Sequence, residues 1–349
     1  MTRGAAGGAV LRRVPALATA TLAAGVLAAA ALAGCSAAPG SHAAQSPRSR
    51  AAAPASSGAR ATGQQTTAKT EAAGGSVATC DPYASSLAPL PGPPQVTAGS
   101  WMAHIRERGY LIAGVDQNTY HFGYLNPLDG QFEGFDIDMV KAVAQAIFGS
   151  PGHIRYRAIS DDQRKTDIQE GSVDIVAHTM TILCSRLKDE DFSSVYFVAH
   201  QRVLVLKDST VTGLDQLGGQ KVCATKGSDS AGFIANYNAT SPVAEHPVVV
   251  PVTYWTDCLV LLQQRQVAAV STDDTILEGL QAQDPFTKLV GGNLTDEPYG
   301  LAIAKQHPEL VRFVNAVLAR MYKDGAWEKS YNQWVSPAHV TPPETKYAN

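Results

Sequence analysis

The sequence has few charged residues and lacks a strong excess of either sign. Of its 349 residues, 17% are charged, and the formal net charge is −3. It therefore lacks the basic excess that marks a nucleic-acid-binding protein. The chain also lacks the glycine or heptad periodicity of fibrous proteins. At 45% hydrophobic residues it is too apolar to be disordered throughout, and its length suits two domains.

Long apolar runs are also scarce. Only residues 14–34 approach the length of a membrane span, which excludes a polytopic membrane protein. Arg3, Arg12 and Arg13 precede this run, and the combination predicts an export signal. The run ends in L-A-G-C at Cys35, which resembles the lipobox of bacterial lipoproteins. That resemblance implies a signal peptide over residues 1–34, a lipidated Cys35 and a protein held at the extracytoplasmic face of the cell membrane. The alternative is an uncleaved membrane anchor with an incidental cysteine.

The next segment has almost no residues that could form a core. Residues 36–79 contain no aromatic side chain, and Val77 is their only large aliphatic one. Because so little apolar surface cannot offset the entropy of ordering the chain, we predict a flexible tether over residues 35–79. From Cys80 onward, 21 basic residues face 30 acidic ones, a net charge of −9, which suits an extracellular domain.

Beyond Cys35 the chain has only four cysteines, and no C-x-x-C or H-x-x-x-H pair that would suggest a metal site. An even number in an exported chain predicts two disulfides, with three possible connectivities. We favour Cys223–Cys258, which would join a strand to a nearby helix, and Cys80–Cys184, which would fasten the end of the tether to the folded body. The alternative is free buried thiols.

The rest of the chain alternates strand and helix patterns in two series. In the first series we expect strands at residues 110–115, 154–159, 173–177 and 203–206, and helices at 136–148 and 166–169. In the second series we expect strands at residues 221–225, 248–253, 267–271 and 300–304. Helices are expected from about residue 228, from 257, at 275–281 and from 308. This order predicts two α/β lobes with mostly parallel sheets. Ligands of such sheets bind beyond the carboxyl ends of strands, which directs attention to loops 116–124, 179–186, 225–230 and 271–274.

Eight short motifs in these loops and strands resemble a known family, the type II solute-binding proteins for polar amino acids (family 3 of the binding proteins of ABC importers). They are GVD at 114–116, GFDID at 134–138, GSVDI at 171–175, MTILCSR at 180–186, DFS at 191–193, GSDS at 227–230, STDD at 271–274 and EPYG at 297–300. The resemblance implies an α/β fold of two lobes with a ligand cleft between them.

The resemblance also implies a division of the chain. It gives a first lobe over residues 80–205, a second over 206–297, and a return to the first lobe over 298–349. The cysteine positions look closest to a subset of exported lipoproteins that bind glutamine, glutamate or aspartate, and this supports the two disulfides favoured above.

Residue by residue, the resemblance assigns ligand contacts. Arg186 matches the arginine that grips the ligand α-carboxylate, because a planar guanidinium donates two parallel hydrogen bonds to a carboxylate. Asp273 matches the acid that receives the α-ammonium. Thr179 and Thr181 match positions that offer hydroxyl or backbone groups nearby. Since Arg186 lies in the first lobe and Asp273 in the second, binding one zwitterion is expected to draw the lobes together.

Four further residues are candidates with open alternatives. Ser228 and Asp229 stand at a helix start, where free N–H groups favour an anion, but Asp229 would oppose an acidic ligand unless a cation such as Lys226 compensates it. Asp116 contacts the ligand or only orders its own loop. Tyr120 is the candidate for an aromatic face that stacks on the ligand.

The functional expectation is a receptor that captures glutamine, glutamate or aspartate by hinge closure and delivers it to an ABC permease. A second possibility is a sensor that reports the ligand to a membrane partner linked to a kinase. A third is an exported dehydratase acting on arogenate or prephenate, but we can place no pair of catalytic carboxylates, so we expect no enzymatic activity. We also expect no cofactor, no metal and no nucleic-acid partner, and assign no role to the lone histidines His121 and His178.

Overall fold

The computed structural model describes residues 80–240, 245–336 and 341–348. The predicted signal peptide, Cys35 and the predicted tether, all within residues 1–79, lie outside the described residues. Within the described ranges, no helix combines the length and the apolar character needed to cross a membrane.

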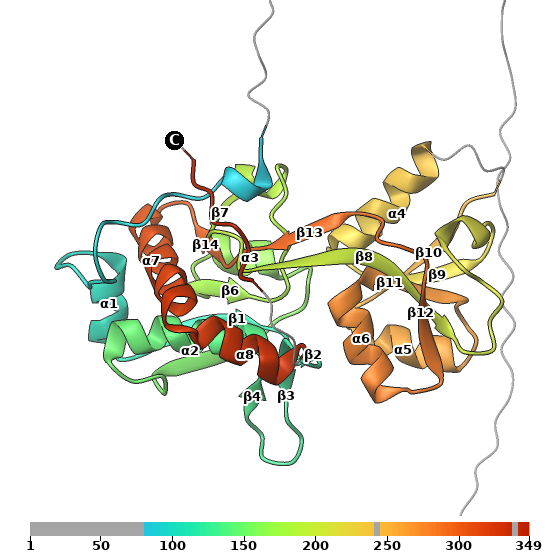
Figure 1. Cartoon of the computed structure of the whole chain (residues 1–349), viewed down its shortest axis with the longest axis horizontal. Helices are drawn as coiled ribbons and strands as arrows, with labels where there is room; N and C mark the ends of the chain where they lie inside the picture. Colours follow the sequence, from blue (N-terminus) through green and yellow to red (C-terminus); the bar gives the residue numbers. More distant parts are fainter. Residues whose placement is uncertain (1–79, 241–244, 337–340, 349) are drawn as a thin grey trace, which may run out of the picture. The chain divides into compact units, whose positions relative to one another are not determined.

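The first sheet has five strands in the order β5-β1-β6-β14-β7 (Figure 1). The strand β1 (Leu111–Val115) pairs in parallel with β5 (Ile154–Ala158) and with β6 (Ile175–Ala177). The late strand β14 (Ala302–Ala304) is antiparallel to both β6 and β7 (Glu190–Phe192). The chain therefore returns to its first sheet after the strands of the second sheet.

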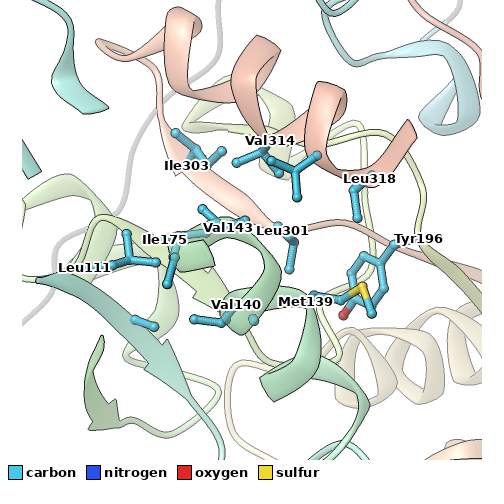
Figure 2. Packing of buried hydrophobic residues seen from close by; sticks show 14 of the residues in the cluster. Leu111, Met139, Val140, Val143, Ile175, Tyr196, Leu301, Ile303, Val314 and Leu318 are labelled. Atoms are coloured by element: carbon cyan, nitrogen blue, oxygen red, sulfur yellow. The ribbon is translucent and has the colours of Figure 1, made fainter. Parts of the chain in front are cut away.

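Helices cover this sheet and complete its core. They are α1 (Trp101–Arg108), α2 (Phe135–Phe148), α3 (Arg164–Gln169), α7 (Pro308–Asp324) and α8 (Ala326–Trp334). As expected, a proline opens α7, whose apolar face is buried in one cluster with strand and α2 side chains. Figure 2 shows side chains from α2, α7 and the strands meeting in this cluster.

The second sheet has the order β10-β9-β11-β8-β12. Its parallel part consists of β10 (Val248–Val252), β9 (Lys221–Thr225) and β11 (Ala269–Asp273). The strand β8 (Phe197–Leu206) is antiparallel to both β11 and β12 (Thr287–Val290). The predicted mainly parallel sheet is thus a mixed sheet, because β8 enters it from the first lobe in the opposite direction.

Three helices belong to this second sheet: α4 (Asp229–Thr240), α5 (Trp255–Gln263) and α6 (Asp274–Gln283). A separate apolar cluster forms between them and the strands. Both favoured disulfides are present in the structure, Cys223–Cys258 between β9 and α5, and Cys80–Cys184. The fold is therefore of the expected α/β, two-lobe class, with two buried apolar clusters in the described part of the first lobe and one in that of the second.

Two adjacent strands connect the lobes. The amino-terminal part of β8 pairs antiparallel with β13 (Asp296–Tyr299), and the rest of β8 pairs within the second sheet (Figure 1). Phe197 and Tyr299, which are paired in register, pack in the core of the first lobe. The lobe boundaries that we expected, at 205/206 and 297/298, lie at the end of β8 and within β13.

Several elements differ from the sequence-based expectation. The strand expected at 203–206 begins at Phe197, and the strand expected at 267–271 is β11, shifted toward Asp273. In both cases buried polar residues, such as Gln201 and Asp273, lie in the strand and weaken the apolar pattern. Loop 116–124 contributes to a small unexpected sheet of β2 (Asn118–Thr119), β3 (Gly123–Leu125) and β4 (Phe132–Glu133). The single-turn helices are η1 (Pro82–Ala84), η2 (Arg186–Lys188) and η3 (Leu214–Gln216).

Candidate functional site

Arg186 points from the first lobe toward the second. It begins η2, and its side chain is only 13% exposed. Its Nη1 donates to the Thr181 carbonyl oxygen at 2.7 Å, and its Nη2 lies 3.8 Å from Oδ1 of Asp229 in the second lobe. Burial lowers the pKa of the guanidinium and the charge of Asp229 opposes that change. The arginine is thus held partly desolvated and ready for an anionic partner.

The loop before Arg186 is held by a buried carboxylate from α2. Asp136 accepts a hydrogen bond from the Thr179 backbone N–H at 2.8 Å and another from the Tyr196 hydroxyl at 2.5 Å. Burial raises the pKa of Asp136 to about 6. Thr179 has a positive φ of 42°, a strained conformation for a β-branched residue. The GFDID motif therefore supports the loop and not the ligand directly.

Asp273 ends β11 in the second lobe and is 2% exposed. Its Oδ2 accepts a hydrogen bond from the Tyr299 hydroxyl at 2.5 Å, while its buried Oδ1 has no hydrogen-bond partner. Burial raises the pKa of Asp273 well above its ordinary value, and the nearby Asp229 and Glu297 carboxylates add to the rise. A cation that approached Oδ1 would relieve both effects.

Ser228 and Asp229 take different parts at the start of α4. The Ser228 hydroxyl donates to the Thr225 carbonyl at 2.8 Å and accepts from the Ala231 N–H at 3.2 Å, so it caps the helix. Burial alone would raise the pKa of Asp229, but the charge of Arg186, hydrogen bonds with Glu297 and Thr181 and the charge of Arg164 together hold that pKa below its ordinary value. Asp229, and not the helix terminus, is the group that faces Arg186.

Glu297 on β13 is the site residue that the sequence reasoning missed. One oxygen each from Glu297, Asp229 and Asp273 lie within 4.8 Å of one another. Burial and then the charge of Asp229 raise the pKa of Glu297 to about 8. Its only sequence signal was membership of the EPYG motif, which gave no hint that β13 crosses between the lobes beside Asp273.

The same three carboxylates are the only group of acidic, histidine or cysteine side chains in the described ranges that is close enough to hold a metal ion. The Arg186 guanidinium, 3.8 Å from Asp229, adds a positive charge at the edge of this group. Such a charge disfavours a bare divalent cation. It suits a ligand that carries both an ammonium and a carboxylate.

Asp116 and Tyr120 lie in a neighbouring part of the first lobe. The Asp116 carboxylate accepts hydrogen bonds from the backbone N–H of Gln117 at 2.6 Å and of Asn118 at 2.9 Å, and from the Thr119 hydroxyl at 2.5 Å. These contacts order its own loop, one of the two roles left open. Tyr120 is 36% exposed, and its ring packs against Tyr124. A ligand contact of either residue stays a prediction.

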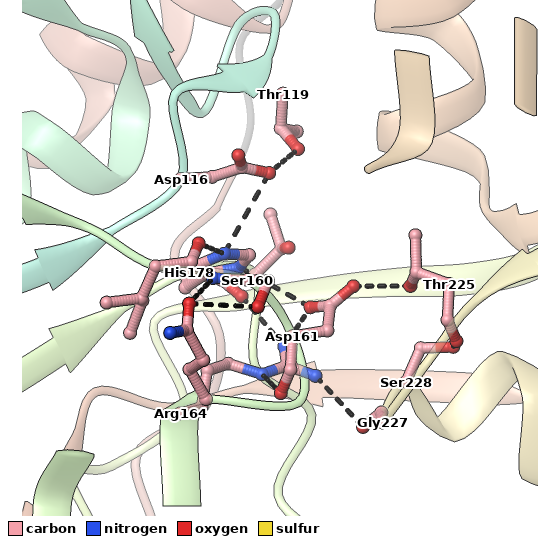
Figure 3. Close-up of polar contacts among 12 residues, drawn as sticks. Asp116, Thr119, Ser160, Asp161, Arg164, His178, Thr225, Gly227 and Ser228 are labelled. Atoms are coloured by element: carbon pink, nitrogen blue, oxygen red, sulfur yellow. Dashed lines mark hydrogen bonds and ion pairs between the residues drawn. The ribbon is translucent and has the colours of Figure 1, made fainter. Parts of the chain in front are cut away.

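A second set of polar contacts joins the lobes around Arg164 and Asp161 (Figure 3). Buried Arg164 makes an ion pair with Asp161 at 2.9 Å and donates to the Gly227 carbonyl at 3.4 Å. The Thr225 hydroxyl donates to the Asp161 carboxylate. The Nδ1 atom of His178 lies 3.6 Å from Asp161. The loops after β5, β6 and β9 therefore meet at one place, and the loop after β5 was not among those that the sequence singled out.

A cavity of about 350 Å³ borders this contact. Its lining includes Arg164, Arg186 and Glu190 from the first lobe and Gly227 from the second. The structure thus brings Arg186, Thr181, Asp229 and Asp273 together, and of these four residues Arg186 lines the cavity.

Comparison with known proteins agrees with this geometry. Residues 111–337 match the family model of bacterial extracellular solute-binding proteins, family 3. The chain belongs to this family. The family resemblance drawn from the eight motifs is therefore confirmed.

Two relatives and one solved structure illustrate the similarity. The chain is 35% identical to the ABC transporter glutamine-binding protein GlnH of Bacillus subtilis, over 67% of this chain and 84% of that protein. It is 30% identical to the glutamate-binding protein GluB of Corynebacterium glutamicum, over 64% and 77%. An ancestral arginine-binding protein bound to glutamine has a TM-score of 0.60 and 32% identity, over 65% of this chain and 98% of that structure.

Proposed function

We propose that this family 3 protein is a lipid-anchored extracytoplasmic receptor that captures glutamine, glutamate or aspartate and delivers it to an ABC permease. The observation that carries the proposal is the meeting of Arg186 from one lobe with Asp229 and Asp273 from the other, where the buried Oδ1 of Asp273 has no hydrogen-bond partner. The names of the glutamine- and glutamate-binding relatives support the same ligand class.

In this proposal Arg186 binds the ligand α-carboxylate, and Asp273 binds the α-ammonium through its unpaired Oδ1. Thr179 and Thr181 border the carboxylate, while Asp116 and Tyr120 border the side chain of the ligand. Closing the two lobes around one zwitterion removes both charges from water. Micromolar affinity needs about −8 kcal/mol, which an enclosed clamp of this kind can supply.

We also propose that binding involves no chemical conversion of the ligand. The clamp matches the two charged ends of an amino acid without requiring a general acid or base. Incubation with L-arogenate is expected to form no phenylalanine, as measured by ultraviolet absorbance. Formation of phenylalanine would overturn this part of the proposal.

A thermal-shift screen of the twenty amino acids tests the proposal and names the ligand. Arg186→Ala is expected to weaken binding by at least about 2 kcal/mol, or ~30-fold, because the ligand carboxylate then lies buried without its partner. The matched control is Arg320→Ala, which changes a largely exposed arginine of α7 and is expected to leave binding unchanged. An Arg186→Ala protein that folds and shows an undiminished ligand shift would contradict the assignment.

A further inference from the structure

The three carboxylates around Asp273 come from three different elements. Asp229 begins α4, Asp273 ends β11 and Glu297 lies on β13. We propose that these residues form a single ammonium-binding triad, which holds a proton while it is empty and releases that proton when the ligand amino group enters. This inference rests on the proposed function and adds Glu297 to the ligand-binding residues.

The charges around the triad leave it short of positive partners. Asp229 lies 3.8 Å from the Arg186 guanidinium and also feels the positive charge of Arg164. The carboxylates of Asp273 and Glu297 face each other and Asp229, with oxygens within 4.8 Å. The other titratable groups that act on the triad are Asp274, Tyr299 and Tyr83. Because three buried negative charges at this spacing repel one another strongly, the empty site favours a bound proton.

An unpaired acceptor atom points to what replaces the proton. Oδ1 of Asp273 is buried and has no hydrogen-bond partner, whereas the Thr181 hydroxyl is shared between the Asp229 and Glu297 carboxylates. The Asp273 and Thr181 residues are only 2% and 1% exposed. An ammonium group offers three N–H donors and one positive charge, so it can satisfy the acceptors and the excess negative charge together.

Glu297 is a group of the triad that can exchange its proton near neutral pH. Burial and the charge of Asp229 raise its pKa to about 8, so it is mostly protonated at pH 7 in the empty site. An ammonium beside it stabilises the ionised form and lowers that pKa. Binding at pH 7 therefore releases up to one proton. Above about pH 8 the carboxyl is already ionised before the ligand arrives, and the release fades.

Calorimetric titration with L-glutamine, L-glutamate and L-aspartate, in buffers with different ionisation enthalpies, measures this proton directly. We expect release of between about half a proton and one proton at pH 7, and affinity that rises by up to tenfold per pH unit between about pH 5.5 and 7.5. Binding without proton release at pH 7 overturns the triad and leaves the proposed function standing. Absence of binding by all three amino acids overturns both.

Two variants separate Glu297 from the other groups. Glu297→Gln removes the titratable carboxyl, so we expect binding to persist with little proton release and a flatter pH profile. The matched control Glu107→Gln changes an exposed residue of α1 and should keep the wild-type profile. Unchanged proton release in folded Glu297→Gln overturns the role of Glu297. Titrating Ca²⁺, Mg²⁺ or Zn²⁺ into chelator-treated protein is a further check, since heat that Glu297→Gln abolishes would make the triad a metal site and overturn the inference.

Discussion

At the scale of single residues, position sets the charge of each carboxyl group in the site. Asp229 and Glu297 lie side by side, yet the pKa of Asp229 is lowered and that of Glu297 is raised to about 8. The charge of Arg186 helps to keep Asp229 ionised, whereas burial and the charge of Asp229 favour the protonated form of Glu297. The sequence predicted Arg186 and Asp273 from their motifs. It could not predict Glu297, because only the pairing of β13 with β8 brings this residue beside the other two.

A testable prediction at this scale concerns Asp136, which is fully buried and holds Thr179 in its strained conformation. Asp136→Ala is expected to lower the free energy of unfolding by about 2–4 kcal/mol, because the Thr179 N–H and the Tyr196 hydroxyl lose their acceptor. Asp136→Asn keeps an acceptor for Thr179 and should cost clearly less. Urea unfolding of both variants measures the difference, and equal losses would show that the hydrogen bond does not matter.

At the scale of elements, regular apolar patterns were the reliable signal. Strand β9 and helices α2 and α7 lie within one or two residues of their expected ranges, because their buried faces repeat with the period of a strand or a helix. The small sheet β2-β3-β4 and the first half of β8 were missed. These segments are short or carry buried polar side chains whose partners come from distant parts of the chain.

The disulfide between β9 and α5 gives an element-scale prediction. Cys223 and Cys258 are fully buried, and their bond closes a loop with a sequence separation of 35 residues. Replacing both with alanine is expected to lower the free energy of unfolding by about 2–4 kcal/mol, because the unfolded chain gains freedom. Denaturant unfolding checks this, with thiol mapping of the parent protein to show that the pairing exists in solution. A stable variant with unchanged unfolding would contradict the role given to the bond.

At the scale of the whole described molecule, the backbones of the two lobes approach each other so closely at Gly279 that a side chain would not fit there. A Cβ atom added to Gly279 in α6 would lie 2.6 Å from the carbonyl oxygen of Tyr120 in the first lobe. The two lobes therefore meet here only because this helix position has no side chain. The sequence could not predict this, since Gly279 lies inside an otherwise ordinary helix.

We expect Gly279→Ala to hinder lobe closure and weaken ligand binding by about tenfold, since overlap with a backbone atom costs roughly 1–3 kcal/mol. The change should not harm the separate lobe, because alanine favours a helix more than glycine does. Gly232→Ala in α4 is the matched control, since a Cβ there meets nothing within 4 Å. Calorimetry measures both affinities, and equal values in the two variants would refute a tight contact in the bound state.

The bond between Cys80 and Cys184 has a mechanical consequence. It fastens the first described residue to the segment that carries Arg186, two positions farther along the chain. A force applied to the chain before Cys80 would therefore be transmitted through this disulfide to the lobe that carries Arg186. The other lobe is continuous with the first through β8 and β13 and has no disulfide to Cys80, so it could move relative to a lobe that is covalently fastened to the preceding chain.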